Sequence, residues 1–580
     1  MCGLVATYNL DKTVFDKSFE RIKFRGKDAH SELAITSKLR FGHARLAING
    51  LGLQGKQPMR SYCKRYVIVF NGEIYNFRSL SKRYLGTDYQ SDTRVFVEFV
   101  SKFGISKSLE YFDGPYAFVL YDNLESKLFF ARDVFGEKPL YYLLGENSLH
   151  ISSSFLSFDD SKPFSSEVDF LNTGRLSQSK NTVGGLSSVK PGKLYSYSGN
   201  QITISDFSST LVRPLERNFL FSTIFEEQVR RISEADVPCG LLLSGGVDST
   251  SVAVALKNCE VDISTFTLAF DDPRIDESHK AIRVANALGF KSNIVNFDDS
   301  RVEEYFVEYI SQMDQPIGDQ AGLPFYILAK EAAKSVKVVL TGDGGDEKFA
   351  GYEMYSLYNR LNFLPGSKFL YSILGRLGIT DVNSVCKLLL SVAGDELFRY
   401  KVFTSNPYAY QRVNYLYSDS LFPNLQFSNE EEYFSKAQCF DFDFNLPEGL
   451  LVKTDRLTMV NSIEARTPFL SRRYSSEMCD SEKRNLYGKQ LIRKYIASYF
   501  SGSDSFNTPK QGFISPVYCW LNGGLRNRLF ELLASDGDTQ RSEHYKKLFF
   551  SLKPDSFKAC QALWFYIVLQ SWLQINKRCL

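Results

Sequence analysis

Two patterns of hydrophobic and polar positions follow one another along this chain. In its first part, short apolar runs are separated by polar turn residues, and the runs at 116–121 and 127–131 flank such a turn, which predicts a β-hairpin. A further apolar run at 67–70 predicts a strand that ends in a turn at Asn71-Gly72. Residues 152–192 are rich in Ser, Gly, Asn and Lys with little periodicity, so we expect loops at a domain edge.

From residue 215 onward, runs typical of strands alternate with stretches of helical spacing. This alternation predicts a parallel sheet with helices on both faces, in which ligands bind beyond the carboxyl ends of the strands. Residues after 360 are predicted to be mainly helical. The predicted elements are helix 215–233, strand 240–243, helix 248–256, strand 264–270, helix 276–288, strand 292–297 and strand 336–340.

Composition and charge narrow the functional classes. The 69 Lys and Arg residues nearly balance the 66 Asp and Glu residues, which argues against nucleic acid or a membrane surface as the main partner. No apolar run approaches the roughly 18 residues of a membrane-spanning helix. The ten cysteines form no CxxC pair and the N-terminus lacks a signal-peptide pattern, so we expect a reducing, cytoplasmic location and small-molecule partners.

A cysteine follows the initiator methionine. Removal of Met1 would place the Cys2 thiol and a free α-amine on one residue. An α-amine has a pKa of about 7.7–8.0, so it can accept the thiol proton and activate the nucleophile without a histidine partner. A cysteine at position 2 is more often incidental, so this interpretation depends on the residues that accompany it.

Polar residues around position 71 could form a binding site beside Cys2. Asn71 and Gly72 can aim an amide and a backbone N–H at one point, as an oxyanion hole requires. Arg45 can pair with a carboxylate, while Glu73 and Asp92 can accept hydrogen bonds from an ammonium group. Together these groups suit a zwitterion such as glutamine. For each residue alone, the alternative is a β-turn with solvated charges.

The segment 244–249 (SGGVDS) joins a predicted buried strand to a predicted helix. Its glycines allow an anion to approach closely, and the helix N-terminus offers unpaired N–H groups. The Walker A pattern is missing, so adenylation is favoured over γ-phosphoryl transfer, with Asp248 as a Mg²⁺ ligand. A plain glycine turn is the alternative. The expected ATP-binding residues are Leu243, Ser244, Gly245, Gly246, Asp248, Ser249, Thr341 and Gly342.

A second loop, 341–347 (TGDGGDE), follows another predicted strand and should lie at the same edge of the sheet. Asp346 is the expected second Mg²⁺ ligand, and Asp343 is a candidate base. The alternative is an acidic surface turn.

These motifs, in this order, resemble the glutamine-hydrolysing asparagine synthetase family over nearly the whole chain. The first half resembles the class II glutamine amidotransferase domain at residues 1–3 (MCG), 42–46 (GHARL), 57–59 (QPM), 71–76 (NGEIYN), 91–93 (SDT), 131–133 (ARD) and 138–142 (KPLYY). The second half resembles the synthetase domain at the two loops and at 276–277 (DE), 314–319 (DQPIGD), 455–459 (DRLTM), 464–470 (EARTPFL), 488–493 (GKQLIR) and 510–513 (KQGF).

The resemblance implies an α/β protein of two domains. Residues 2–155 would form the glutaminase domain, an N-terminal-nucleophile hydrolase αββα sandwich, and residues 156–214 an edge and linker segment. Residues 215–580 would form the synthetase domain, a PP-loop ATP pyrophosphatase-type fold with a doubly wound parallel sheet and a helical C-terminal part. A homodimer is one arrangement that the resemblance allows.

The resemblance also implies the chemistry. Cys2 would attack the glutamine amide, ATP with Mg²⁺ would adenylate a carboxylate, and ammonia would travel through an internal tunnel and displace AMP. Lys489 would stabilise charge on the adenylated intermediate, and Asp343 would assist the attack of ammonia. Aspartate is the favoured acceptor, which would give asparagine, AMP, pyrophosphate and glutamate.

Several positions depart from the family pattern. Phe24 and Lys27 interrupt its HRGPD motif, and Arg94 stands where an acidic residue is usual. Gln315 replaces a common Glu, and Ser471 replaces an Asp. These differences leave another carboxylate open as the acceptor, such as a surface-sugar uronate or a secondary-metabolite precursor. A non-catalytic nucleotide-binding regulator and a bare glutaminase are the remaining alternatives.

Overall fold

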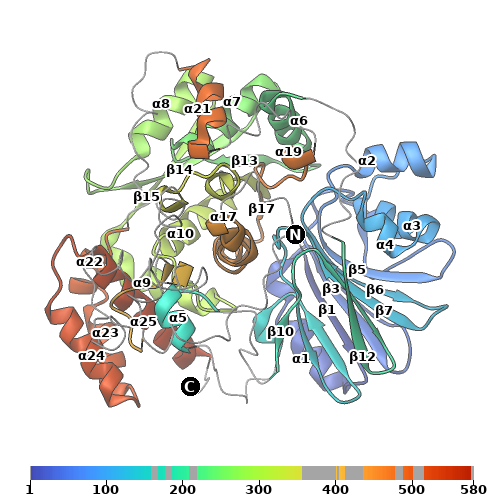
Figure 1. Ribbon diagram of the computed structural model, residues 1–580, viewed down its shortest axis with the longest axis horizontal. Coiled ribbons are helices and arrows are strands. Elements are labelled where there is room, and N and C mark those ends of the chain that lie inside the picture. Colours follow the sequence, from blue (N-terminus) through green and yellow to red (C-terminus); the bar gives the residue numbers. More distant parts are fainter. Residues whose placement is uncertain are drawn as a thin grey trace, which may run out of the picture.

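The computed structural model describes the chain in nine ranges: 2–158, 167–176, 185–207, 219–355, 400–401, 404–411, 436–476, 487–500 and 515–576. Within these ranges an N-terminal β-rich domain lies beside a larger α/β domain (Figure 1). This arrangement confirms the predicted two-domain α/β class. None of the helices in the described ranges combines the length and the apolar character that crossing a bilayer requires.

The N-terminal domain contains two antiparallel sheets of six strands each. The first has the order β10-β8-β9-β1-β3-β2, with β1 (Gly3–Tyr8), β2 (Ala29–Ala34), β3 (Leu39–Arg45), β8 (Tyr141–Leu144), β9 (Leu149–Ser152) and β10 (Ser187–Ser188). The second has the order β12-β11-β7-β6-β5-β4, with β4 (Met59–Arg60), β5 (Tyr66–Gly72), β6 (Tyr116–Asp122), β7 (Lys127–Arg132), β11 (Lys193–Ser198) and β12 (Gln201–Asp206). The β6–β7 pair is the predicted hairpin.

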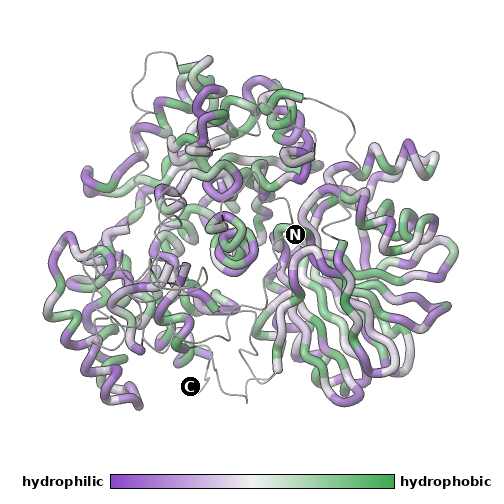
Figure 2. Tube along the Cα trace, viewed as in Figure 1, coloured by the Kyte–Doolittle hydropathy of each residue, from purple (hydrophilic) through white to green (hydrophobic). Residues whose placement is uncertain are grey.

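Alternation along the strands builds a four-layer sandwich. In β5, Val67 and Val69 face the first sheet, while Ile68 and Phe70 face a helical layer, because successive side chains point to opposite faces of a strand. That helical layer consists of α2 (Phe77–Leu80), α3 (Asp92–Phe103) and α4 (Ile105–Leu109). Helix α1 (Lys12–Glu20) covers the first sheet. The hydrophobic colour is concentrated in the strands of this sandwich (Figure 2).

Three local predictions for the first half differ from the structure. Asn71 and Gly72 are the last residues of β5, paired with β6, and do not form a turn after it. The stretch that was predicted to be loops contains α5 (Glu167–Thr173) and β10. Residues 187–206, all of which were expected to belong to the edge and linker segment, contribute β10, β11 and β12 to the two sheets. In β11, Leu194 packs on the helical side and Tyr195 and Tyr197 pack between the sheets, so both faces of the strand are buried.

The second domain is built on a five-stranded parallel sheet with the order β15-β14-β13-β16-β17. The strands are β13 (Cys239–Leu242), β14 (Ser264–Phe270), β15 (Lys291–Phe297), β16 (Val338–Leu340) and β17 (Glu464–Arg466). The surrounding helices are α6 (Phe221–Ser233), α7 (Val247–Asn258), α8 (Ser278–Leu288), α9 (Val302–Gln312), α10 (Gly322–Ala332) and α11 (Gly345–Lys348). The strands and helices predicted between 240 and 340 are confirmed; the predicted helix at 215–233 is confirmed from Phe221, and 215–218 lie outside the described residues.

Both faces of this sheet are covered. Leu241 packs with α6, α7 and α8, whereas its neighbour Leu242 packs with α10 on the opposite face. Such double coverage is typical of doubly wound parallel sheets. The chain leaves the centre of the sheet in both directions, so β13 and β16 flank the point where the strand order reverses, which is where ligands bind in such folds.

The remaining described residues are mainly helical, as predicted, with one exception. β17 is a three-residue strand that pairs with β16, and no periodicity can reveal a strand so short. The helices are α17 (Lys436–Phe440), a π-helical stretch at Asp441–Leu450, α18 (Leu451–Met459), α19 (Arg473–Ser476), α21 (Gln490–Ala497), α22 (Val517–Asn522), α23 (Arg526–Ser535), α24 (Thr539–Phe550) and α25 (Phe557–Ile575). The motif at 510–513 lies outside the described residues.

Candidate active sites

Cys2 lies just before β1, almost fully buried, with its thiol next to the domain interface. Its backbone N–H donates a hydrogen bond to Asn71 Oδ1 at 2.9 Å, and its Sγ lies 3.9 Å from the carbonyl oxygen of Leu46. Burial raises the pKa of the Cys2 thiol above its usual range, so the thiol needs a base before it can attack.

Asn71 and Gly72 are held beside Cys2 by the end of β5. The Asn71 side chain is completely buried, and its Nδ2 has no hydrogen-bond partner among the described residues. A buried donor without a partner is costly, so this amide is available to a ligand oxygen. Gly72 has φ 148, and a Cβ there would overlap the carbonyl oxygen of Pro115, so only glycine fits.

Arg45, Asp92 and Glu73, which were expected to hold glutamine, lie at the end of β3, at the start of α3 and just after β5. Arg45 donates hydrogen bonds to the carbonyl oxygens of Gly52 at 2.8 Å and Gly50 at 2.5 Å, so it fixes the loop after β3. Asp92 begins α3 and accepts from the backbone N–H of Ile74 at 3.3 Å. Burial raises the pKa of Asp92 to about 6.

Glu73 is the third of these residues, and it also lies near the second domain. Its Oε1 accepts a hydrogen bond from Asn49 Nδ2 at 2.6 Å, and its Oε2 lies 3.7 Å from the guanidinium of Arg466 in β17. Burial and the nearby Asp92 raise the pKa of Glu73 well above its usual range. Arg466 belongs to a motif noted in the sequence, but only the fold reveals that it lies beside Glu73.

The loop after β13 has the geometry of an anion cradle. Ser244 and Ser249 hydroxyl groups lie 3.0 Å apart, and the Gly246 N–H donates to Ser244 Oγ at 3.3 Å where α7 begins. Gly245 has φ 74, and a Cβ there would lie 2.6 Å from the backbone nitrogen of Ala281. The loop after β16 packs against it, since a Cβ on Gly342 would lie 3.0 Å from Ser249 N. The two predicted loops therefore meet at one edge of the sheet.

Two carboxylates and one ammonium group meet between these loops. Lys489 Nζ lies 2.6 Å from Asp248 Oδ2 and 2.5 Å from Asp346 Oδ1, and all three side chains are largely buried. A Cβ on Gly351 would overlap both Asp346 and Lys489, so the cluster requires glycine at that position. The fold thus brings together three residues that lie up to 241 positions apart.

The cluster fits the ions that nucleotide chemistry requires. No group of three or more potential metal ligands occurs in the described part of the chain. Mg²⁺ in nucleotide-binding sites is held by one or two carboxylates and by substrate phosphates, so the carboxylates of Asp248 and Asp346 form a suitable donor pair. Lys489 supplies a fixed positive charge next to the same carboxylates.

Asp343 lies on the same loop but faces a different helix. Its Oδ2 accepts hydrogen bonds from Thr341 Oγ1 at 3.0 Å and from Thr454 Oγ1 at 2.7 Å. Thr454 belongs to α18, and no sequence motif pointed to it. Its short hydroxyl side chain gave no signal, because Thr at a helix position is usually structural.

A buried ion-pair network connects α18 to the N-terminal domain. Arg25 donates two hydrogen bonds to Asp455, at 3.0 and 2.9 Å, and its Nε donates to the carbonyl oxygen of Cys2 at 3.2 Å. Burial acts to raise the pKa of Asp455, but the guanidinium groups of Arg25 and Arg456 hold it below the usual range. Arg456 in turn lies 2.7 Å from Asp314.

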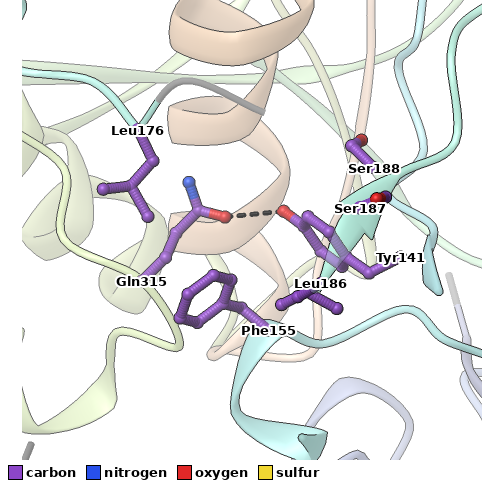
Figure 3. A pocket seen from close by; sticks show the side chains of 7 residues that line it. All are labelled: Tyr141, Phe155, Leu176, Leu186, Ser187, Ser188 and Gln315. Carbon is purple, nitrogen blue, oxygen red and sulfur yellow. Dashed lines mark hydrogen bonds between the residues drawn. The ribbon is translucent and has the colours of Figure 1, made fainter. Parts of the chain in front are cut away.

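Tyr141 extends this contact between the domains. Its hydroxyl donates to Gln315 Oε1 at 2.6 Å (Figure 3). The same hydroxyl accepts from Arg456 at 2.9 Å. Beside the Tyr141–Gln315 bond lies a cavity of about 10 Å³, room for roughly one water molecule, which is further lined by Phe155, Leu176, Leu186, Ser187 and Ser188. Gln315, noted as a departure from the family pattern, is therefore an interface residue.

Comparisons with known proteins agree with both halves of the fold. The family model described as a glutamine amidotransferase domain matches residues 1–208, which include the two antiparallel sheets. The profile described as asparagine synthase matches residues 221–574. The chain belongs to the asparagine synthase family, whose members use ATP.

The curated relatives cover nearly the full length. Asparagine synthetase [glutamine-hydrolyzing] 1 of Bacillus subtilis is 26% identical over 99% of this chain and 97% of its own. A putative asparagine synthetase of Methanocaldococcus jannaschii is 26% identical over 79% of this chain and 98% of its own. Amidase chyE of Penicillium rubens is 25% identical over 90% of this chain and 87% of its own, so a relative described as an amidase has a comparable identity.

Proposed function

We propose that this chain transfers the amide nitrogen of glutamine to a carboxylic acid that it first adenylates with ATP, releasing AMP, pyrophosphate and glutamate. The supporting observation is the position of α18. Thr454 of this helix contacts Asp343 beside the nucleotide loops, and the next residue, Asp455, contacts Arg25, which holds the backbone of Cys2. One helix therefore joins the two candidate sites.

At the glutaminase site, Cys2 would be the nucleophile. The raised pKa of its thiol means that a base must remove the proton, and the α-amine of the same residue, freed by loss of Met1, can do so. The thiolate would then attack the glutamine amide. The unpartnered Nδ2 of Asn71 and the N–H of Gly72 would stabilise the resulting oxyanion, while Arg45, Glu73 and Asp92 would orient the zwitterion.

At the nucleotide site, residues 243–249 with Thr341 and Gly342 would hold ATP, and Asp248 with Asp346 would hold Mg²⁺. The ion would neutralise charge on the phosphates during adenylation. Lys489, fixed between the two aspartates, would stabilise charge that develops on the pyrophosphate and the acyl adenylate. Asp343, oriented by Thr341 and Thr454, would accept a proton from the attacking ammonia.

The buried contact between the domains suits transfer of ammonia. Ammonia attacks only when it is unprotonated, and bulk water would protonate most of it. The residues that join the domains, Arg25, Asp455, Arg456 and Tyr141, are all nearly inaccessible to solvent. An enclosed route past them would keep ammonia neutral and exclude the water that hydrolyses an acyl adenylate.

Two acceptors are candidates. Aspartate, which would give asparagine, is favoured by the family and by relatives described as asparagine synthetases. Another carboxylic acid is favoured by the equal similarity to relatives described as amidases. We also propose a cytoplasmic location and small-molecule partners, and a homodimer can be tested by light scattering.

A panel of acids tests the proposal. Purified protein would be incubated with ATP, Mg²⁺, each acid, and either glutamine or ammonium chloride, with AMP, pyrophosphate and glutamate measured. We expect one acid class to yield equal amounts of AMP and pyrophosphate with both nitrogen donors. Absence of pyrophosphate with every acid would reject the proposal and favour the nucleotide-binding regulator.

A further inference from the structure

A cavity of about 500 Å³ lies next to α11 and has no assigned ligand. Its lining shares no residue with 243–249 or with 341–346, so it is separate from the proposed ATP site. Cavities of about 300–1,000 Å³ are typical of small-molecule sites. The volume exceeds what an acid as small as aspartate fills.

Two consecutive residues of α11 connect this cavity to the nucleotide loops. Asp346 contacts Lys489, whereas Glu347 lines the cavity. Glu347 is almost fully buried, and its Oε1 accepts a hydrogen bond from the Tyr352 hydroxyl at 2.8 Å. Its Oε2 is also buried and has no hydrogen-bond partner among the described residues. This oxygen is therefore available to a donor in the cavity.

The described lining is rich in acidic groups. It contains one guanidinium, Arg175, against five carboxyl groups: Asp319, Glu347, Glu353, Asp441 and Glu448. Asp319 is paired with Lys453 at 2.7 Å, and Glu448 has a further interaction of its own. The acidic character of the wall therefore comes mainly from Glu347, Glu353 and Asp441. A second carboxylate of a ligand would be repelled here, whereas an ammonium or guanidinium group would be attracted.

We propose that this cavity holds the cationic end of the acceptor, which is a carboxylic acid with a longer chain than aspartate that carries an ammonium or guanidinium group. The inference rests on the proposed function, since it names the acid that is adenylated. The carboxylate end would point to Asp346 and Lys489, and the cationic end would meet Glu347. Aromatic rings of Tyr352 and Phe565 in the wall favour a cation further.

Three acids of equal chain length test the charge preference. They are 5-aminovalerate with an ammonium group, valerate without charge at that end, and glutarate with a carboxylate there; aspartate is the fourth probe. Binding to the full-length protein is measured by calorimetry without ATP, and pyrophosphate release is measured with ATP, Mg²⁺ and ammonium chloride. We expect 5-aminovalerate to exceed the other three by at least about tenfold in both measurements.

Two variants assign the preference to the cavity. Glu347→Gln and Glu353→Gln remove charge and keep side-chain size, and we expect each to lower the ratio of 5-aminovalerate to valerate by at least about fivefold. Because the readout is the ratio of the two acids in the same variant, a general loss of ATP-dependent activity would leave it unchanged. Glu303→Gln, in the first turn of α9 and outside the lining, is the control and should leave the ratio unchanged.

The outcomes separate the two proposals. Preferred binding of 5-aminovalerate without pyrophosphate release would support the cavity assignment and reject the proposed function. Pyrophosphate release that is greatest with aspartate or glutarate would support the function and overturn the cavity assignment. A ratio that neither variant changes would also overturn it.

Discussion

Thr454 and Asp455 are consecutive residues of α18, yet Thr454 contacts the loop after β16 and Asp455 contacts the N-terminal domain. The Thr454 hydroxyl donates to Asp343 at 2.7 Å, while Asp455 accepts two hydrogen bonds from Arg25, whose Nε reaches the Cys2 carbonyl. Neighbouring residues on a helix point about 100° apart, so a single turn can touch two domains. The nucleophile and the candidate base are thereby fixed to one rigid element.

Replacement of the nucleophile should separate the two activities. We expect Cys2→Ala to lower glutamine-dependent amidation by at least about 10³-fold, because removal of a nucleophile abolishes the covalent step. Amidation with ammonium chloride should stay within about twofold, since the nucleotide site is distinct. Glutamate release measures glutamine hydrolysis, and AMP release measures adenylation of the acceptor. Cys63→Ala, at an exposed cysteine, is the control, and loss of both activities in Cys2→Ala would contradict the division.

Removal of one nucleotide-site carboxylate should stop adenylation from either nitrogen source. We expect Asp248→Asn to lower pyrophosphate release by at least about 10²-fold, because Lys489 contacts this carboxylate and the proposed Mg²⁺ site includes it. Glutaminase activity should persist. Asp272→Asn, at the edge of the same domain, should have no effect. Continued AMP formation in Asp248→Asn would refute the loop assignment.

Two adjacent glycines of the nucleotide loop should differ in their tolerance of a methyl group. Gly245→Ala places a Cβ at φ 74 and 2.6 Å from Ala281 N, whereas Gly246→Ala meets nothing closer than 3.4 Å at φ −73. The left-handed conformation alone costs about 1–2 kcal/mol. We expect Gly245→Ala to lose ATP binding in equilibrium titrations and Gly246→Ala to retain more of it. Equal loss in both variants would show that the Gly245 backbone is not the cause.

The buried ion pair between the domains should matter far more than an exposed one. Arg25→Met removes a partner of Asp455, and we expect the free energy of unfolding to fall by about 3–5 kcal/mol. The glutamate formed per product should rise above one, because Cys2 loses its link to α18. Lys337→Met breaks the partly exposed pair with Asp28, which should cost about 0–1 kcal/mol. Denaturant titration and product stoichiometry measure these effects; equal costs would argue against the network.

Acid should destabilise the N-terminal domain through His43. Burial lowers the pKa of His43 to about 3, and its Nε2 lies 3.1 Å from the carbonyl oxygen of Phe70. Below about pH 6.5 the unfolded chain binds a proton that the folded chain rejects, so stability falls as the pH drops toward 3, by about 5 kcal/mol in total. We expect His43→Gln to flatten this slope, as measured by urea titrations at pH 7 and 5. The exposed His30→Gln should keep the slope.

Much of the architecture follows from sequence pattern. Strong alternation of strand and helix between 240 and 340 predicted the parallel sheet, and the two glycine-rich loops meet at one edge of it, as expected. β17 and β11 escaped prediction because one has three residues and the other alternates Ser with Tyr, so tertiary pairing decides both. Arg25 lies between Phe24 and Lys27, in a segment that departs from the family's HRGPD pattern, and Thr454 belongs to no motif noted in the sequence. Their roles depend on contacts across more than 100 positions, which no local pattern encodes.

The Nε of Arg25 donates a hydrogen bond to the main-chain oxygen of Cys2, so this contact does not involve the thiol. This contact between the domains therefore does not depend on which side chain residue 2 carries. A chain without the thiol would therefore keep the contact that joins residue 2 to α18 through Arg25. The Cys2→Ala variant would bind glutamine without hydrolysing it. Its affinity for glutamine could then be compared with and without ATP at the nucleotide loops.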